Sequence, residues 1–241
     1  MAKMSLEELV SQLRAAYGAD LRSIVLYGSA AAGEHIAKRS DYNVLVIVDA
    51  LDAAKLTAAS AASRAWSEAG NPAPLTLTTS EWRGSADIFP MEYADILERH
   101  RVLFGDAPFD GIRVDKKDLR LQLEQEAMGK LIKLRQGTLA SGNDGGRQVE
   151  LLAASASAIM IIFRAFLRLQ GAVAPKDNVA LTQEVARVAA FDPEPFKQVV
   201  RHVRGEQVIA ANGAGGILSA YLRGMEQLVG YLDRYQPAKE L

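Results

Sequence analysis

Strand-like patterns occur only in the first half of this 241-residue chain, and that asymmetry limits the folds it can adopt. Short β-branched runs broken by Gly or Pro predict strands, and helical periodicity predicts helices between them. The predicted strands are residues 21–27, 41–49, 75–79 and a short 100–104. The predicted helices are residues 5–17, 51–69 and the later part of 85–99. Because residues 44–48 are continuously apolar, the second strand is expected to be buried on both faces.

After about residue 115 the strand patterns stop, and Gly, Asn and Pro breaks separate five predicted helices. These cover residues 119–139, 149–169, 178–190, 195–203 and 217–235. The chain holds 39 alanines, and alanine has the highest intrinsic helix propensity. The predicted fold class is therefore α+β, with an α/β domain of residues 1–110 built on a small mixed sheet and an all-helical bundle of residues 115–241.

Charge and cysteine content exclude several classes of function. The 28 basic and 29 acidic residues leave a net charge of −1, so no global positive field attracts a polyanion and no nucleic-acid partner is expected. The chain has no cysteine, which excludes disulfides, thiolate metal sites and a cysteine nucleophile. The three histidines are scattered and have no metal-ligand spacing.

No segment of the sequence predicts membrane insertion or export. The most apolar run, residues 151–163, is shorter than the roughly 20 residues that a helix needs to cross a bilayer, so we interpret it as a buried helix. The first residues include Glu7 and Glu8 and contain no apolar signal core. These features predict a cytoplasmic protein with no membrane contact. The alanine-rich bundle also offers a candidate face for a homodimer.

The residues between the first two predicted strands form a pattern that is typical of phosphate binding. The first strand ends at Gly28-Ser29, where Gly28 permits close backbone approach and Ser29 offers a hydroxyl, and a following helix start would present free N–H groups. At the start of the second strand, Asp41 and Asn43 occupy alternate positions and are expected on one face. Oxygen ligands beside a phosphate site are the arrangement that holds Mg²⁺ for phosphoryl chemistry.

This pattern resembles the signature of the DNA polymerase β-like nucleotidyltransferase superfamily, in which a Gly-Ser pair and a short helix precede Asp-x-Asp on the next strand. The matching residues are Leu26-Tyr27-Gly28-Ser29 and, after ten residues, Ser40-Asp41-Tyr42-Asn43. Residues 88–90, 92–94 and 101–105 are similar to the segment that ends the catalytic domain of aminoglycoside adenylyltransferases, where a helical domain follows. The resemblance implies a nucleotidyltransferase-type α/β domain, a helical bundle and a site in the cleft between them.

The sequence departs from the acids that this resemblance implies. The family uses three carboxylates, two in the Asp-x-Asp and one on a later strand, to bind two Mg²⁺ ions and activate the attacking hydroxyl. Asp41 matches the first and remains the expected metal ligand, but Asn43 stands where the second belongs. The third should fall on residues 75–79, Leu-Thr-Leu-Thr-Thr, which contain no acid. An amide or hydroxyl cannot offset the charge of two cations as a carboxylate does.

A few nearby residues are candidates for the missing roles. Glu92 is the acid near the end of the motif that could substitute as a general base, although a structural carboxylate on a short helix is the simpler interpretation. Lys38 and Arg39 precede Asp41 and could reach a phosphate, with a solvated pair as the alternative. Asn43 is a candidate phosphate-side ligand, and an ordinary strand residue is the alternative.

Two functions are consistent with these residues. By resemblance, the chain would transfer a nucleotidyl group, AMP by analogy, from a Mg²⁺-nucleoside triphosphate to a small-molecule hydroxyl, with activity impaired or lost because two of three carboxylates are missing. The alternative is a non-catalytic nucleotide-binding or small-molecule-binding regulatory module on the same fold. Either function implies a nucleotide or small-molecule ligand. A single carboxylate with phosphate oxygens can still hold Mg²⁺, so the cofactor is expected at a weakened site.

Overall fold

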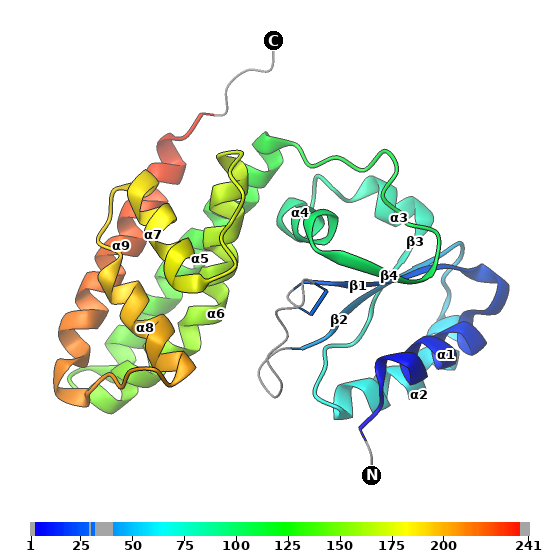
Figure 1. The fold of residues 1–241 in the computed structure, drawn as a ribbon, viewed down its shortest axis with the longest axis horizontal. Helices are drawn as coiled ribbons and strands as arrows, with labels where there is room; N and C mark the ends of the chain where they lie inside the picture. The colour runs from blue at the N-terminus through cyan, green and yellow to red at the C-terminus, as the bar shows by residue number, and fades with distance from the viewer. Residues whose placement is uncertain (1–2, 29, 32–40, 237–241) are drawn as a thin grey trace. The chain divides into compact units, whose positions relative to one another are not determined.

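The computed structural model describes residues 3–28, 30–31 and 41–236. The chain divides into two compact units, Met1–Val114 and Asp115–Leu241. The first unit holds a four-stranded mixed sheet in the order β3-β2-β1-β4 (Figure 1). Its strands are β1 (Leu21–Tyr27), β2 (Asn43–Val48), β3 (Leu75–Thr78) and β4 (His100–Gly105). β1 runs antiparallel to β2 and β4, whereas β3 runs parallel to β2.

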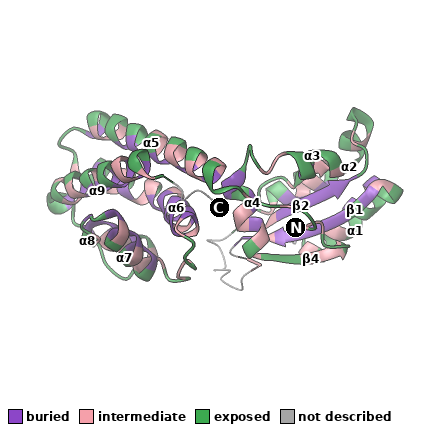
Figure 2. Cartoon of the chain, turned by 90° about the horizontal axis from the view of Figure 1, so that it is seen from above, coloured by how far each residue is buried: buried purple, intermediate pink, exposed green. Residues whose placement is uncertain are grey.

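Helices cover both faces of this sheet and make two apolar layers. The cluster on one face joins α1 and α2 to the sheet, and the cluster on the other joins α3 and α4 to it. The bounds are α1 (Leu6–Tyr17), a 3₁₀ turn η1 (Gly18–Asp20), α2 (Ala53–Glu68), α3 (Thr79–Gly84) and α4 (Pro90–Glu98). Side chains of β2 alternate between the two layers, with Val44 and Val46 on the first and Leu45 on the second. The predicted burial of this strand on both faces is confirmed, and Figure 2 shows it in the buried colour.

Capping residues explain where several of these elements begin and end. Ser5 and Glu8 form a capping box at the start of α1, with the Glu8 amide donating to the Ser5 hydroxyl oxygen at 3.2 Å. Thr78 and Glu81 form a second capping box, which ends β3 at Thr78 and starts α3. The predicted strand 75–79 is therefore one residue too long, and α3 is a helix that apolar periodicity does not predict. The predicted strand 41–49 starts too early, since β2 begins at Asn43.

The second unit is entirely helical among the residues described. Its elements are α5 (Lys116–Ser141), α6 (Gly145–Leu169), α7 (Asn178–Ala189), α8 (Glu194–Arg204), a 3₁₀ turn η2 (Ala211–Gly213) and α9 (Ala214–Arg234). These correspond to the five predicted helices, and the α+β fold class is confirmed. Aspartates at 115, 144 and 177 cap α5, α6 and α7 through their side chains, so the first two helices begin earlier than their apolar periodicity indicates.

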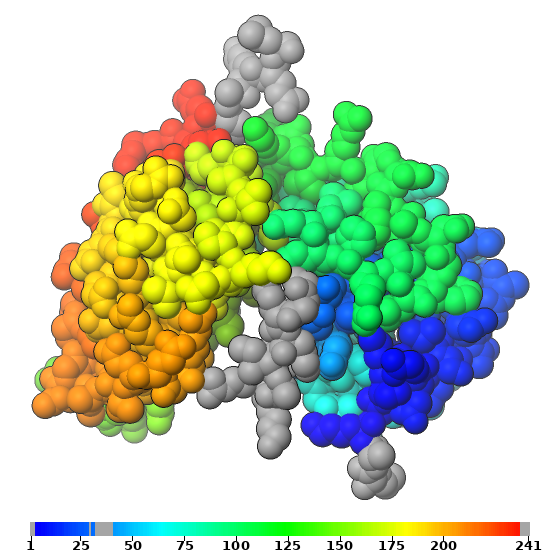
Figure 3. Space-filling view, viewed as in Figure 1, coloured from blue at the N-terminus to red at the C-terminus, as the bar shows by residue number. Residues whose placement is uncertain are grey.

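The core of the second unit is built around α6, which packs against α5, α7, α8 and α9. By length and composition α6 is apolar enough to span a membrane. In the structure, however, its buried side chains include Ile159, Phe163 and Phe166 and form the centre of the bundle. The rings of Phe163 and Phe196 lie 5.4 Å apart, and Phe196 stacks on Tyr221 of α9 at 4.1 Å. The helices α7 and α8 lie on one face of this unit (Figure 3, yellow to orange).

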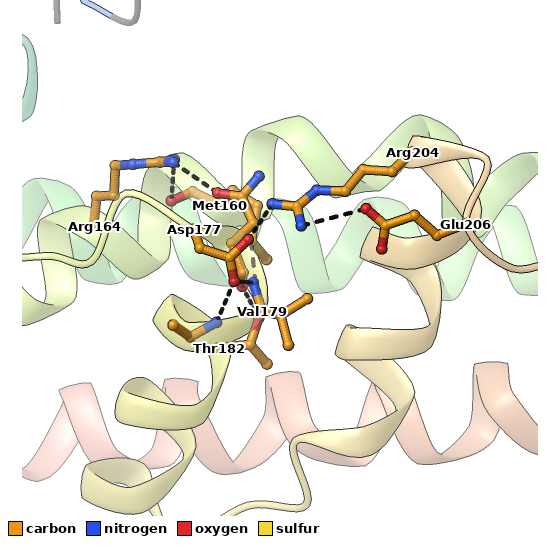
Figure 4. A network of polar contacts seen from close by, with 9 residues as sticks. Met160, Arg164, Asp177, Val179, Thr182, Arg204 and Glu206 are labelled. Carbon is orange, nitrogen blue, oxygen red and sulfur yellow. Dashed lines mark hydrogen bonds and ion pairs between the residues drawn. The ribbon is translucent and has the colours of Figure 1, made fainter. Parts of the chain in front are cut away.

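A polar network fastens α6, α7 and α8 together (Figure 4). Asp177 accepts hydrogen bonds from the Val179 and Ala180 amides and pairs with Arg204 at 2.7 Å. Arg164 of α6 donates to the Asn178 side chain at 2.7 Å. Partial burial raises the pKa of Asp177, but the Ala180 amide and Arg204 lower it by more, so its pKa lies below the ordinary value.

Candidate functional site

The candidate site lies where β1 ends and β2 begins. In the antiparallel register Tyr27 pairs with Asn43 on one side and with His100 of β4 on the other. Gly28 follows directly and has φ +78°, a left-handed conformation that favours glycine. Its amide donates to the Arg99 carbonyl at 3.0 Å, and its carbonyl accepts from the Ala31 amide at 3.1 Å. The sheet therefore ends in a tight turn whose backbone is fixed at Gly28.

Two polar side chains converge on Gly28. A Cβ placed on this glycine would stand 3.4 Å from Asn43 Nδ2 and 3.7 Å from Asp95 Oδ2. Asn43 comes from the sheet and Asp95 from α4, so the turn is flanked by an amide and a carboxylate from different elements. The structure thus brings together Gly28 and Asn43, two of the residues that the sequence marks for phosphate binding, and adds an acid beside them.

Asp95 is held in a defined orientation by its own helix. Pro90 occupies the first turn of α4, and the buried side chains of Tyr93 and Ile96 attach the helix to the sheet. Asp95 Oδ1 accepts from Arg99 Nε at 3.1 Å. The two side chains are only 24% and 17% exposed, so this pair is less screened than a surface ion pair. The other carboxylate oxygen, Oδ2, is the one that faces Gly28.

The acids of α4 bring negative charge to this end of the sheet, where Tyr27 ends β1. Burial raises the pKa of the Tyr27 hydroxyl above its usual value, and the charges of Asp95 and then Glu92 raise it further. Glu92 lies in the first turn of α4 and is exposed. The Tyr27 hydroxyl therefore stays neutral at physiological pH and can donate a hydrogen bond there.

Asp41 is exposed and lies just before β2, where it lines a cavity of about 590 Å³ within the first unit. The cavity runs between the start of α1 and the end of α2, and its wall includes Lys3, Glu7, Trp66 and Arg101. Trp66 is buried, and its indole nitrogen has no hydrogen-bond partner among the described residues. Asp41 thus shares this cavity with a second acid, Glu7, and with two basic side chains.

The other predicted site residues have different outcomes. Ser29, Lys38, Arg39 and the helix expected after Gly28-Ser29 lie outside the described residues. β3, the strand on which the third acid was expected, runs parallel to β2 with Leu75 paired to Leu45. It carries no acid.

Asp95 is the site residue that the sequence analysis missed. In the sequence, Asp95 stands one helical turn after Glu92 and one turn before Arg99, which puts all three toward one side of α4. This spacing is the signal that could have identified Asp95. The sequence of that region begins irregularly, so the face of the helix that meets the sheet could not be assigned.

The donor set near Gly28 fits a cation that is carried by a nucleotide better than a metal held by protein alone. Across the part of the chain that the structure describes, no group of three or more His, Cys, Asp or Glu side chains could hold a metal ion. Mg²⁺ is commonly bound by one or two carboxylates with substrate phosphates and water completing its shell. Near Gly28, Asp95 and the Asn43 amide are groups of that kind, whereas Asp41 lines the cavity beside α1 and α2.

The fold as a whole is similar to that of a solved enzyme. The crystal structure of spectinomycin adenyltransferase AAD(9) from Enterococcus faecialis, obtained with ATP and spectinomycin, matches this chain with a TM-score of 0.59. The fold is nucleotidyltransferase-like. The match covers 92% of this chain and 98% of that chain at 11% sequence identity. No family model and no curated protein sequence matches the chain.

Proposed function

We propose that this protein binds a Mg²⁺-nucleoside triphosphate at the Gly28 end of β1 and β2, and that nucleotidyl transfer from it to a small-molecule hydroxyl is impaired or lost. The observation that carries the proposal is the convergence of Asn43 and Asp95 on the left-handed turn at Gly28. Support comes from the fold, since the similar enzyme was crystallised with ATP and with a small molecule. By analogy with that adenyltransferase, the transferred group would be AMP.

Binding follows from the groups that the turn presents. A glycine backbone in the left-handed region admits a phosphate more closely than any side-chain-bearing residue does. The Asn43 amide can donate to a phosphate oxygen, and Asp95 can face the cation. Asp41, just before β2, remains a predicted ligand of that cation. Lys38 and Arg39 remain predicted phosphate contacts on the segment between β1 and β2.

Impaired transfer follows from the groups that are absent in the sequence. An acceptor hydroxyl needs a general base within hydrogen-bond reach, and β3 supplies only leucine and threonine where the family resemblance implies an acid. Glu92 stays our candidate for a substitute base. Asp95 already accepts a hydrogen bond from Arg99 Nε at 3.1 Å, so we do not assign it the role of general base.

The binding half of the proposal is tested by thermal denaturation of the whole chain with ATP, GTP, CTP or UTP, each with Mg²⁺ and with EDTA. A ligand that binds only the folded state adds about 2.7 kcal/mol of stability at a hundredfold excess over its Kd. We expect at least one nucleotide to raise the melting temperature, and inorganic phosphate at the same concentration to do so less. If no nucleotide shifts the melting temperature in either condition, the proposal is wrong.

A second candidate, a transferase that remains active, is favoured by the carboxylate of Asp95 beside Gly28. It predicts transfer of label from α-³²P-ATP to a metabolite extract by the unmodified protein. The two candidates therefore share binding and differ in turnover.

A further inference from the structure

Asn43 stands where the family resemblance implies an acid, and a carboxylate from a different element, Asp95 of α4, lies near the same glycine. Asp95 Oδ2 and Asn43 Nδ2 flank the same face of Gly28, one from α4 and one from β2. We propose that Asp95 is a ligand for the divalent cation carried by the nucleotide phosphates, and that Asn43 donates to a phosphate oxygen instead of binding metal. This inference rests on the proposed function and assigns the roles within its site.

The chemistry of the two groups supports this division. The Asn43 amide lies beside Gly28, and its N–H group can donate to a phosphate oxygen without adding negative charge there. Asp95 turns a carboxylate oxygen toward the same turn, and a carboxylate suits a cation but repels an unneutralised phosphate. The amide and the carboxylate together suit a bound phosphate whose cation lies on the side of α4.

Asp95 is also built into a rigid part of the fold, as a metal ligand should be. Arg99 occupies Oδ1 through its side chain, and its carbonyl accepts from the Gly28 amide at 3.0 Å. The residue that orients the carboxylate therefore also fixes the turn. Farther back, the Tyr93 hydroxyl donates to the Trp82 carbonyl at 2.7 Å, which ties α4 to α3.

Tyr27 pairs with Asn43 in the sheet and directly precedes Gly28, so the turn that Asp95 faces lies at the end of β1. Glu92 lies on the same side of α4 and is exposed, which suits it better to an outer position than to the cation.

The inference is tested by titrating ATP into the whole protein in excess Mg²⁺ and again in EDTA, for the unmodified chain and for Asp95→Asn. We expect the variant to bind ATP at least roughly tenfold more weakly with Mg²⁺. In EDTA we expect equal or tighter binding, because a negative charge beside the phosphates has been removed. Asp95→Glu, which keeps the charge, should retain part of the Mg²⁺ preference.

The matched control is Glu124→Gln in the second unit. Arg120 and Glu124 form an i,i+4 ion pair with 23% and 26% exposed side chains, close to the values for Arg99 and Asp95. This control should leave both affinities unchanged. Asp95→Asn binding that is unchanged with Mg²⁺, or weakened by the same factor in both conditions, overturns the inference. If the unmodified protein does not bind ATP in either condition, the proposed function itself is wrong.

Discussion

Replacing Gly28 by Ala separates the cost of backbone strain from the loss of a binding surface. Gly28 has φ +78°, and the new methyl group would meet Asn43 Nδ2 at 3.4 Å and Asp95 Oδ2 at 3.7 Å. Those distances are ordinary van der Waals contacts, so the fold can accept the methyl group. The stability cost should therefore come from the left-handed backbone alone, about 1–2 kcal/mol.

Gly111 provides the matched control within the same unit. It has the same φ of +78°, and a Cβ there would meet nothing within 4 Å. Gly111→Ala should therefore cost a similar amount of stability. For a chain of this size each kcal/mol lowers the melting temperature by about 2–4 °C. The two variants should melt within a few degrees of one another and below the unmodified protein.

Only the Gly28 variant should lose nucleotide binding. Its methyl group would occupy the space between the amide and the carboxylate that we assign to the phosphate and its cation. We expect ATP affinity in Mg²⁺ to fall roughly tenfold or more, which is about 1.4 kcal/mol, with no change for Gly111→Ala. Calorimetric titration of both variants measures this. Equal ATP affinity in the two variants would refute the assignment of Gly28 to the phosphate site.

Two further predictions concern the second unit. In Gly224→Ala the new Cβ would overlap the ring of Phe196, with Cζ at 2.9 Å, so overpacking of about 1–3 kcal/mol should outweigh the gain in helix propensity. By contrast, the Cβ of Gly230→Ala would meet only the Arg234 guanidinium at 3.6 Å, so this variant should stabilise the protein by up to about 1 kcal/mol. Chemical denaturation measures both variants, and a stabilised Gly224→Ala would contradict this packing. Asp177→Asn keeps a good helix cap but loses the half-exposed pair with Arg204, so it should cost well under about 1 kcal/mol at neutral pH. The folded pKa of Asp177 is lowered, so the stability difference between the variant and the unmodified protein should be present above roughly pH 4. It should vanish in stronger acid, as the pH falls through the folded pKa. A stability difference that persists in acid would show that the cap, not the charge, was lost.

Much of the fold could be predicted from the sequence because local patterns and packing agree. The β-branched run at Leu21–Tyr27 is a strand with the predicted bounds. The apolar run after Asn43 is buried on both faces because helices cover both sides of the sheet. α3 escaped prediction because it is a helix of only 6 residues, and its capping box at Thr78 and Glu81 interrupts what looks like a continuing strand. Its start depends on a cap, which apolar periodicity does not report.

The candidate site could be predicted only where its residues are close in sequence. The Gly28 turn and the polar residues before β2 form a motif, and the sheet register brings Gly28 and Asn43 together. Asp95 reaches the same point from a helix about fifty residues later in the chain. Which side of α4 meets the sheet depends on the burial of Tyr93 and Ile96 against strand residues, and these contacts exist only in the folded unit.

The central claim is that this site binds a nucleotide and does not turn it over efficiently, because acids needed for transfer are missing. The most direct measurement is transfer of label from α-³²P-ATP to a metabolite extract by the unmodified protein, under conditions where calorimetry shows that ATP is bound. Asn43→Asp, which restores one acid, is assayed beside it. We predict bound ATP with little or no transfer by the unmodified protein. Efficient transfer by the unmodified protein would contradict the claim.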